Sequence, residues 1–267
     1  MSTSIIQIIK SKCPNIASII GYNPRFWSKV ESAYTQRLKL IKTSIEEGNY
    51  ITVRKSLIDD MILFKKERPK LDALLSDIDL KSKTIYNSIQ SDKKNVDKLR
   101  SILKELIIPE EKDSKSYDRV AEIYAIEYLL SRKNLKLIEL EYKLTNGKRA
   151  DCLIQNAENH EYVLYDFFSI NIDTSKVEDI DNFGKLLVNR IISKYRSKTI
   201  DIETQYPFRL LPILWIENII LKEYFDFLVD SETLLNTEFF MLRGIYNITD
   251  NQFLTLFGPI RDFKYLT

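Results

Sequence analysis

The spacing of apolar residues changes near residue 109, and this change limits the folds open to the chain more than any other feature of the sequence. From residue 24 to about residue 107, apolar residues recur every three or four positions, as Leu57, Met61 and Phe64 do. Residues with this spacing lie on one face of a helix. Breaks in the pattern divide the segment, and the predicted helices span residues 25–47, 51–66 and 69–107, with an interruption allowed in the last.

Strand patterns begin after a charged run at residues 109–115, which has no apolar residue and is typical of a linker. The first predicted elements are a helix over 117–133 and strands over 135–144, 149–154 and 162–172. Asn146 and Gly147 separate the first two strands, and this pair is a strong hairpin signal. The remaining predicted elements are a helix over 182–198, a strand over 208–216 and helices near 217–229, 233–243 and 249–257.

These patterns predict an α/β protein of the α+β type with two domains. A helical module over residues 1–109 precedes a domain over residues 116–267. The second domain has the element order α-β-β-β-α-β and carries further helices at its C-terminal end. The helical module shows no motif beyond helix packing, although a protein partner or a second copy of the chain could bind it.

The composition excludes several classes of function. Forty basic residues nearly balance 38 acidic residues, so a nucleic-acid-binding surface must be local. The six glycines form no phosphate-binding loop, and the single histidine, His160, leaves no histidine triad or histidine metal cluster. Cys13 and Cys152 are far apart, which favours a reducing, cytoplasmic location. No apolar stretch approaches the roughly 20 residues of a membrane helix, so no membrane partner is expected.

Two aspartates interrupt predicted strands and are the first candidates for a site. Asp151 lies in the second strand, and Asp166 lies within the apolar run 163–168 of the third. Aspartate is disfavoured in strands, and a buried unpaired charge is costly. Carboxylates on neighbouring strands can converge on a divalent cation such as Mg²⁺. The alternative is structural, with each aspartate forming an ion pair with a nearby basic residue.

These residues and the order of elements resemble the PD-(D/E)xK nuclease superfamily, which has the restriction-endonuclease-like fold. The resemblance covers about a hundred residues and depends on the sequences GKRADCLI at 147–154 and YVLYDFFSI at 162–170. It implies that Asp151 and Asp166 bind Mg²⁺ or Mn²⁺ together with a glutamate from the preceding helix. Glu122 and Glu127 are the two choices for that glutamate, and the spacing in the family favours Glu122.

Phe168 is a departure from the family pattern, which has a lysine two positions after the second acidic residue. Side chains two apart in a strand share a face, so an aromatic ring takes the place of the ammonium group. A displaced cation could come from Lys185, Arg190 or Arg149. Lys185 ranks first for the catalytic role because arginine does not act as a base at ordinary pH.

The predicted helix over 182–198 also suggests a surface for nucleic acid. Arg190, Lys194 and Lys198 recur every four residues and therefore share a face. Together with Arg149 they could bind a phosphate backbone of DNA or RNA, which the sequence does not distinguish. A solvated basic face is the alternative interpretation.

The leading hypothesis is a metal-dependent phosphodiesterase that binds nucleic acid. Its catalytic set would be Glu122, Asp151, Asp166 and Lys185, with the three acids as metal ligands. The runner-up is a catalytically silent protein of the same fold that serves as a nucleic-acid- or protein-binding scaffold subunit. A third alternative is an unrelated α+β interaction domain.

Overall fold

The computed structural model divides the chain into two compact units. Unit 1 comprises residues 1–123 and 246–254, and unit 2 comprises residues 124–245 and 255–267. The structure describes residues 4–46, 69–108, 115–171, 180–199, 205–215, 222–235, 238–247 and 252–263. The helix predicted over 51–66 and nearly all of the linker predicted over 109–115 lie outside these ranges.

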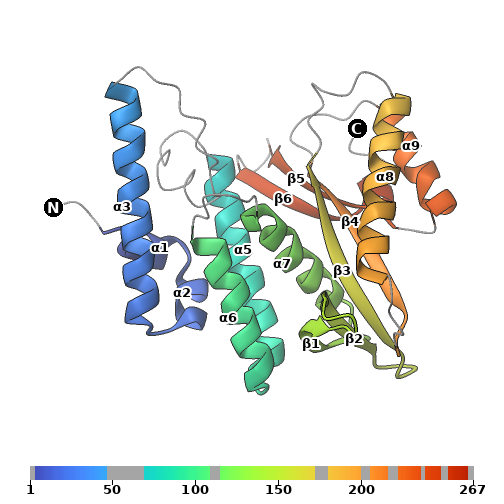
Figure 1. Ribbon diagram of the computed structural model, residues 1–267, viewed down its shortest axis with the longest axis horizontal. Helices are drawn as coiled ribbons and strands as arrows, with labels where there is room; N and C mark the ends of the chain where they lie inside the picture. Colours follow the sequence, from blue (N-terminus) through green and yellow to red (C-terminus); the bar gives the residue numbers. More distant parts are fainter. Residues whose placement is uncertain are drawn as a thin grey trace. The chain divides into compact units, whose positions relative to one another are not determined.

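Unit 1 is built mainly from helices (Figure 1). They are α1 (Ile5–Lys12), α2 (Pro14–Ile20), α3 (Pro24–Glu46), α5 (Pro69–Ile89), α6 (Lys93–Ile107) and the first half of α7 (Lys115–Ser131). The helix predicted over 25–47 is confirmed, and the one predicted over 69–107 is confirmed as two helices. Asp92 begins α6 by accepting hydrogen bonds from the backbone N–H groups of Lys94 and Asn95.

The sequence pattern predicts neither α1 nor α2, and the start of α2 shows why. The Asp79 Oδ1 atom on α5 accepts a hydrogen bond of 2.8 Å from the backbone N–H of Ile16. Asp79 Oδ2 also accepts one of 2.7 Å from the side chain of Asn15. This cap comes from a residue more than sixty positions away, so the only local signals of the helix are Pro14 at its first position and Gly21 after its last.

Unit 2 contains the main part of a six-stranded sheet in the order β1-β2-β3-β4-β5-β6. Strands β1, β2 and β3 are antiparallel neighbours, whereas β3, β4 and β5 run parallel. The strands are β1 (Leu135–Lys143), β2 (Arg149–Asn156), β3 (Tyr162–Asn171), β4 (Phe208–Trp215), β5 (Phe240–Asn247) and β6 (Gln252–Pro259). Helix α8 (Ile180–Thr199) joins β3 to β4, and α9 (Lys222–Leu235) joins β4 to β5. The α+β class and the order α-β-β-β-α-β are confirmed.

The helix predicted over 233–243 is helical only at 233–235, where α9 ends, and its last four residues belong to β5. The helix predicted over 249–257 is wrong, because β6 occupies its described part. Short apolar runs fit a buried strand as well as a helix. Pairing decides between the two states here, since Ile213 and Leu214 of β4 pair with Phe240 and Met241 of β5. The helix predicted near 217–229 is confirmed in its described part, but α9 extends to Leu235.

One face of the sheet is covered by α8 and α9 (Figure 1). Leu187 of α8 and Leu228 of α9 are buried in one apolar cluster with Ile170, Leu210 and Leu214 of the sheet. Leu214 and Leu228 have no exposed surface. This burial fixes which side of α8 meets the sheet, and so which of its basic residues can approach β3.

The opposite face of the sheet carries the C-terminal half of α7. Tyr128 packs edge to face against Phe240 and Phe257, with ring centroids 5.2 Å and 5.8 Å away. Unit 2 therefore has helices on both sides of its sheet (Figure 1). Among the helices in the described ranges, none combines the length and the apolar character needed to cross a lipid bilayer.

Candidate functional site

Asp151 and Asp166 lie where two neighbouring strands stop pairing. The register of β2 and β3 ends at the pair Cys152 and Tyr165, and one further step along it would place Asp151 opposite Asp166. The backbone N–H of Phe167 donates a hydrogen bond of 2.6 Å to Asp151 Oδ2. The Asp151 carboxylate thus takes the place of the backbone carbonyl that accepts such a hydrogen bond in a regular sheet. The two aspartates are cross-strand neighbours at this end of the paired region.

Asp166 is completely buried and its carboxylate faces α8. The Lys198 Nζ atom donates a hydrogen bond of 2.7 Å to Asp166 Oδ1. Lys194 Nζ lies 3.7 Å from Asp166 Oδ2. Within the described part of the chain Oδ2 has no hydrogen-bond partner. A charge buried this deeply needs such cations, since an isolated carboxylate in the core would be very costly.

The hairpin between β1 and β2 holds the end of α8 in place. Asn146 Nδ2 donates to the backbone carbonyl of Lys198 at 3.2 Å, and Lys148 Nζ donates to that of Ser197. Gly147 has a φ of 82°, as this turn requires. Lys198 Nζ in turn donates to the backbone carbonyl of Arg149. The hairpin therefore fixes both the origin and the direction of the Lys198 side chain.

Cations lie beside Asp166 although Phe168 stands where the family pattern has a lysine. Lys194 Nζ lies 5.4 Å from the centroid of its ring, in a cation–π contact. Lys194 thus approaches both the ring of Phe168 and the carboxylate of Asp166. The cations beside Asp166 come from the last two turns of α8 instead of from β3.

Lys185, ranked first for the displaced cation, is an exposed residue of α8. It lies 13 residues before Lys198, which is about 20 Å along a helix axis. Arg190 is also exposed on this helix. Neither residue belongs to the cluster around Asp166, while Lys194 and Lys198, predicted to bind a phosphate backbone, do.

The side chain of Arg149 points to β1 instead of to Asp166. Its guanidinium forms an ion pair of 3.1 Å with Glu141 and is 63% exposed. Glu141 has a φ of 44°, close to a register shift in β1. Only the main-chain carbonyl of Arg149 takes part in the cluster, and no periodicity in the sequence predicts that contact.

Glu122 belongs to unit 1, where it is buried and forms an ion pair with Arg119. Arg119 also binds Glu105, with 2.7 Å between Nη2 and Oε2. Burial disfavours the charged guanidinium, but Glu122 and Glu105 outweigh it and raise the pKa of Arg119. The structure thus gives Glu122 a strong partner on its own helix.

The described residues contain no group of three or more His, Cys, Asp or Glu side chains arranged to hold a metal ion. Asp151 and Asp166 are then the two candidate metal ligands, and Mg²⁺ is often bound by one or two carboxylates plus waters. Asp166 Oδ2, buried and without a hydrogen bond in the described part of the chain, fits a cation. An ion bound there would compete with the ammonium groups of Lys194 and Lys198.

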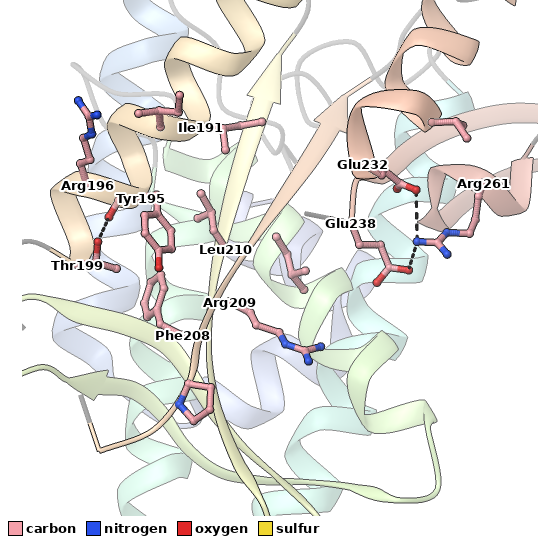
Figure 2. A pocket seen from close by; sticks show the side chains of 14 residues that line it. Ile191, Tyr195, Arg196, Thr199, Phe208, Arg209, Leu210, Glu232, Glu238 and Arg261 are labelled. Atoms are coloured by element: carbon pink, nitrogen blue, oxygen red, sulfur yellow. Dashed lines mark hydrogen bonds and ion pairs between the residues drawn. The ribbon is translucent and has the colours of Figure 1, made fainter. Parts of the chain in front are cut away.

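A pocket of about 1080 Å³ lies beside the cluster, between α8, β4 and α9 (Figure 2). Leu210 lines it and is the cross-strand partner of Asp166. Glu232 and Glu238 both pair with Arg261, at 3.3 Å and 3.5 Å. Burial raises the pKa of Glu232. The sequence gives no local signal for this pocket, because its lining comes from segments that only the fold brings together.

No family model and no curated protein matches the chain. Among solved structures, the chain is similar to SfsA of Pyrococcus furiosus, determined in complex with Ca²⁺, at 13% identity. The match covers 58% of this chain and 65% of the SfsA chain, slightly less than two thirds of its length, with a TM-score of 0.27.

Proposed function

We propose that unit 2 binds the backbone of a nucleic acid and hydrolyses phosphodiester bonds in a reaction that depends on a divalent metal ion. The observation that carries this proposal is the Lys198 ammonium group, 2.7 Å from Asp166. The resemblance to the PD-(D/E)xK superfamily implies two carboxylates and a lysine. Asp151, Asp166 and Lys198 form such a set, with the lysine supplied by a helix.

In this proposal Asp151 and Asp166 hold Mg²⁺ or Mn²⁺, which would activate water and offset charge on the phosphorus oxygens. Lys198 binds a phosphate oxygen or orients the attacking water from the end of α8. Lys194 adds a second positive charge on the same side of Asp166. Because these groups are largely removed from solvent, their fields act more strongly on a phosphate than they would in water.

The complete burial of Asp166 favours a second candidate function. Its ion pair with Lys198 can be purely structural, as buried carboxylate–lysine pairs often are. Unit 2 would then bind nucleic acid or a protein partner as a silent scaffold. The two candidates differ in whether Asp151 and Asp166 are needed for a chemical step.

The test is cleavage of labelled single- and double-stranded DNA and RNA in Mg²⁺, Mn²⁺ or EDTA. Asp151→Asn keeps an oxygen that accepts from the N–H of Phe167, so it removes charge with little change in shape. We expect Asp151→Asn and Lys198→Ala to lower metal-dependent cleavage by roughly a hundredfold or more. Lys29→Ala, which removes an exposed lysine of α3 in unit 1, is the matched control and should cleave normally.

A folded wild-type protein that cleaves none of these substrates in either metal would overturn the hydrolytic proposal. If salt-sensitive binding of nucleic acid persists in that experiment, the silent scaffold is supported. If cleavage occurs but is unaffected by Asp151→Asn and Lys198→Ala, the reaction belongs to a different part of the chain.

A further inference from the structure

The last turns of α8 present two different groups of side chains. Lys194 and Lys198 are one turn apart and face Asp166. Tyr195, Arg196 and Thr199 line the pocket between α8, β4 and α9 (Figure 2). The pocket is thus connected to the carboxylate cluster through one turn of helix, and through Leu210, one strand away from Asp166.

Aromatic and apolar side chains at this pocket remain in contact with solvent. Tyr195 is 46% exposed and Ile192 is 39% exposed, although both are large. Tyr195 meets Phe208 edge to face, with 6.0 Å between ring centroids. Edge-to-face packing against Phe208 holds the tyrosine ring in place, while its exposed area stays open to a flat ligand.

The charges around the pocket suit a nucleotide better than an apolar ligand. Arg196 is an exposed cation of α8, and a guanidinium group can bind phosphate through two hydrogen bonds. Arg209 extends from β4 away from Tyr195, toward the side where Glu238 lies (Figure 2). Glu232 and Glu238 supply carboxylate oxygens, which accept hydrogen bonds from amino groups such as those of bases.

We infer that the pocket takes up one nucleoside of a single-stranded nucleic acid, stacked on Tyr195. The inference rests on the proposed function, in which the backbone of the same strand passes Lys194 and Lys198. Exposed aromatic rings beside cations are the usual means of holding unpaired bases. A duplex would first have to unpair and unstack a base, so single strands are the favoured substrate class.

The pocket volume of about 1080 Å³ is slightly above the roughly 300–1,000 Å³ of ligand pockets, so the pocket is large enough for a nucleoside. A base stacked on Tyr195 would leave room for its sugar and flanking phosphate near Arg196. The carboxylate cluster would then act on a phosphate next to the inserted nucleoside, since Lys194 and Tyr195 are adjacent residues.

The test is equilibrium binding in EDTA, which prevents metal-dependent cleavage. Fluorescence anisotropy would compare a labelled single-stranded oligonucleotide, the same sequence as a duplex, and an abasic oligomer of equal length. We expect Tyr195→Ala to weaken single-strand binding roughly five- to a hundredfold, the range of one base–aromatic stack. Duplex and abasic binding should change less than about twofold. Tyr22→Ala, which removes a tyrosine 95% exposed in unit 1, is the matched control.

An equal loss for all three probes, no loss for any, or no binding by the wild type would overturn the inference. A single-strand-specific loss without cleavage in Mg²⁺ would retain the nucleoside pocket and refute the hydrolytic step. Cleavage that needs Asp151, together with no effect of Tyr195→Ala on binding, would retain the hydrolytic step and refute the nucleoside pocket.

Discussion

At the scale of single residues, the pair of Asp166 and Lys198 explains why an aspartate can lie in an apolar strand. Asp166 interrupts the run 163–168, and its charge is acceptable only because α8 delivers ammonium groups to it. The sequence shows the interruption and the missing lysine at Phe168. It does not show which lysine compensates, because periodicity says which residues of α8 share a face but not which face meets β3.

Breaking this pair from one side should be far more harmful than removing it. Asp166→Leu leaves a partly buried ammonium without its carboxylate, and we expect a loss of about 3–5 kcal/mol in the free energy of unfolding. Asp166→Leu combined with Lys198→Met should regain most of this loss, since an apolar pair often replaces a buried ion pair at no cost. Urea unfolding measures both; equal stability of the single and double variants would contradict the structural part of this argument.

Glu232 should make the stability of unit 2 fall as pH rises. Burial raises its pKa in the folded protein, while the unfolded chain keeps the ordinary value of about 4.3. The folded state then binds the proton more tightly, so this contribution is fully present below the ordinary pKa. It is lost as pH rises through the raised pKa and is constant above it.

The matched variant for this effect is Glu232→Gln, whose amide oxygen can still accept from the N–H of Phe239. Unfolding free energies measured from about pH 3 to pH 8 should show the wild type losing stability relative to the variant across the titration of Glu232. Parallel curves for the two proteins would mean that Glu232 does not titrate abnormally.

At the scale of elements, local pattern was sufficient wherever a signal lies within the segment itself. The strands predicted over 135–144, 149–154 and 162–172 and the helix over 182–198 are confirmed within one to two residues. Strands β5 and β6 were not predicted, because the conformation of β5 is selected by its parallel pairing with β4, and that of β6 by its place next to β5. The same limit applies to the pocket, whose residues meet only after β4 and α9 have packed.

Gly147 lies in the hairpin turn that contacts the end of α8, and substitutions there should lower the free energy of unfolding. A Cβ at Gly147 would meet no atom within 4 Å, so the cost of Gly147→Val lies in the backbone φ of 82° alone. We expect a loss of about 1–2 kcal/mol, and a smaller one for Gly147→Asn, because asparagine tolerates this conformation. Urea unfolding checks both variants; equal losses would show that φ is not the cause.

At the scale of the whole molecule, the net charge of +2 provides no general attraction for nucleic acid. In the proposed function, binding comes from the local charges of α8, where Arg190 and Arg196 are exposed and Lys194 and Lys198 are directed toward Asp166. The basic residues of α8 therefore divide into solvent-facing cations that can bind phosphates along a backbone and inward-facing cations at the candidate site.

This division predicts different salt dependence for different lysine and arginine variants. Affinity for a nucleic acid should fall linearly with salt on logarithmic axes between about 50 mM and 200 mM, because bound phosphates release counterions. Arg190→Ala should weaken binding equally for all sequences and reduce the slope by about 1, since one phosphate contact is lost. Lys29→Ala, an exposed cation on α3 in unit 1, should leave the slope unchanged. If both variants reduce the slope equally, the binding surface extends over unit 1; if neither does, α8 does not bind the backbone.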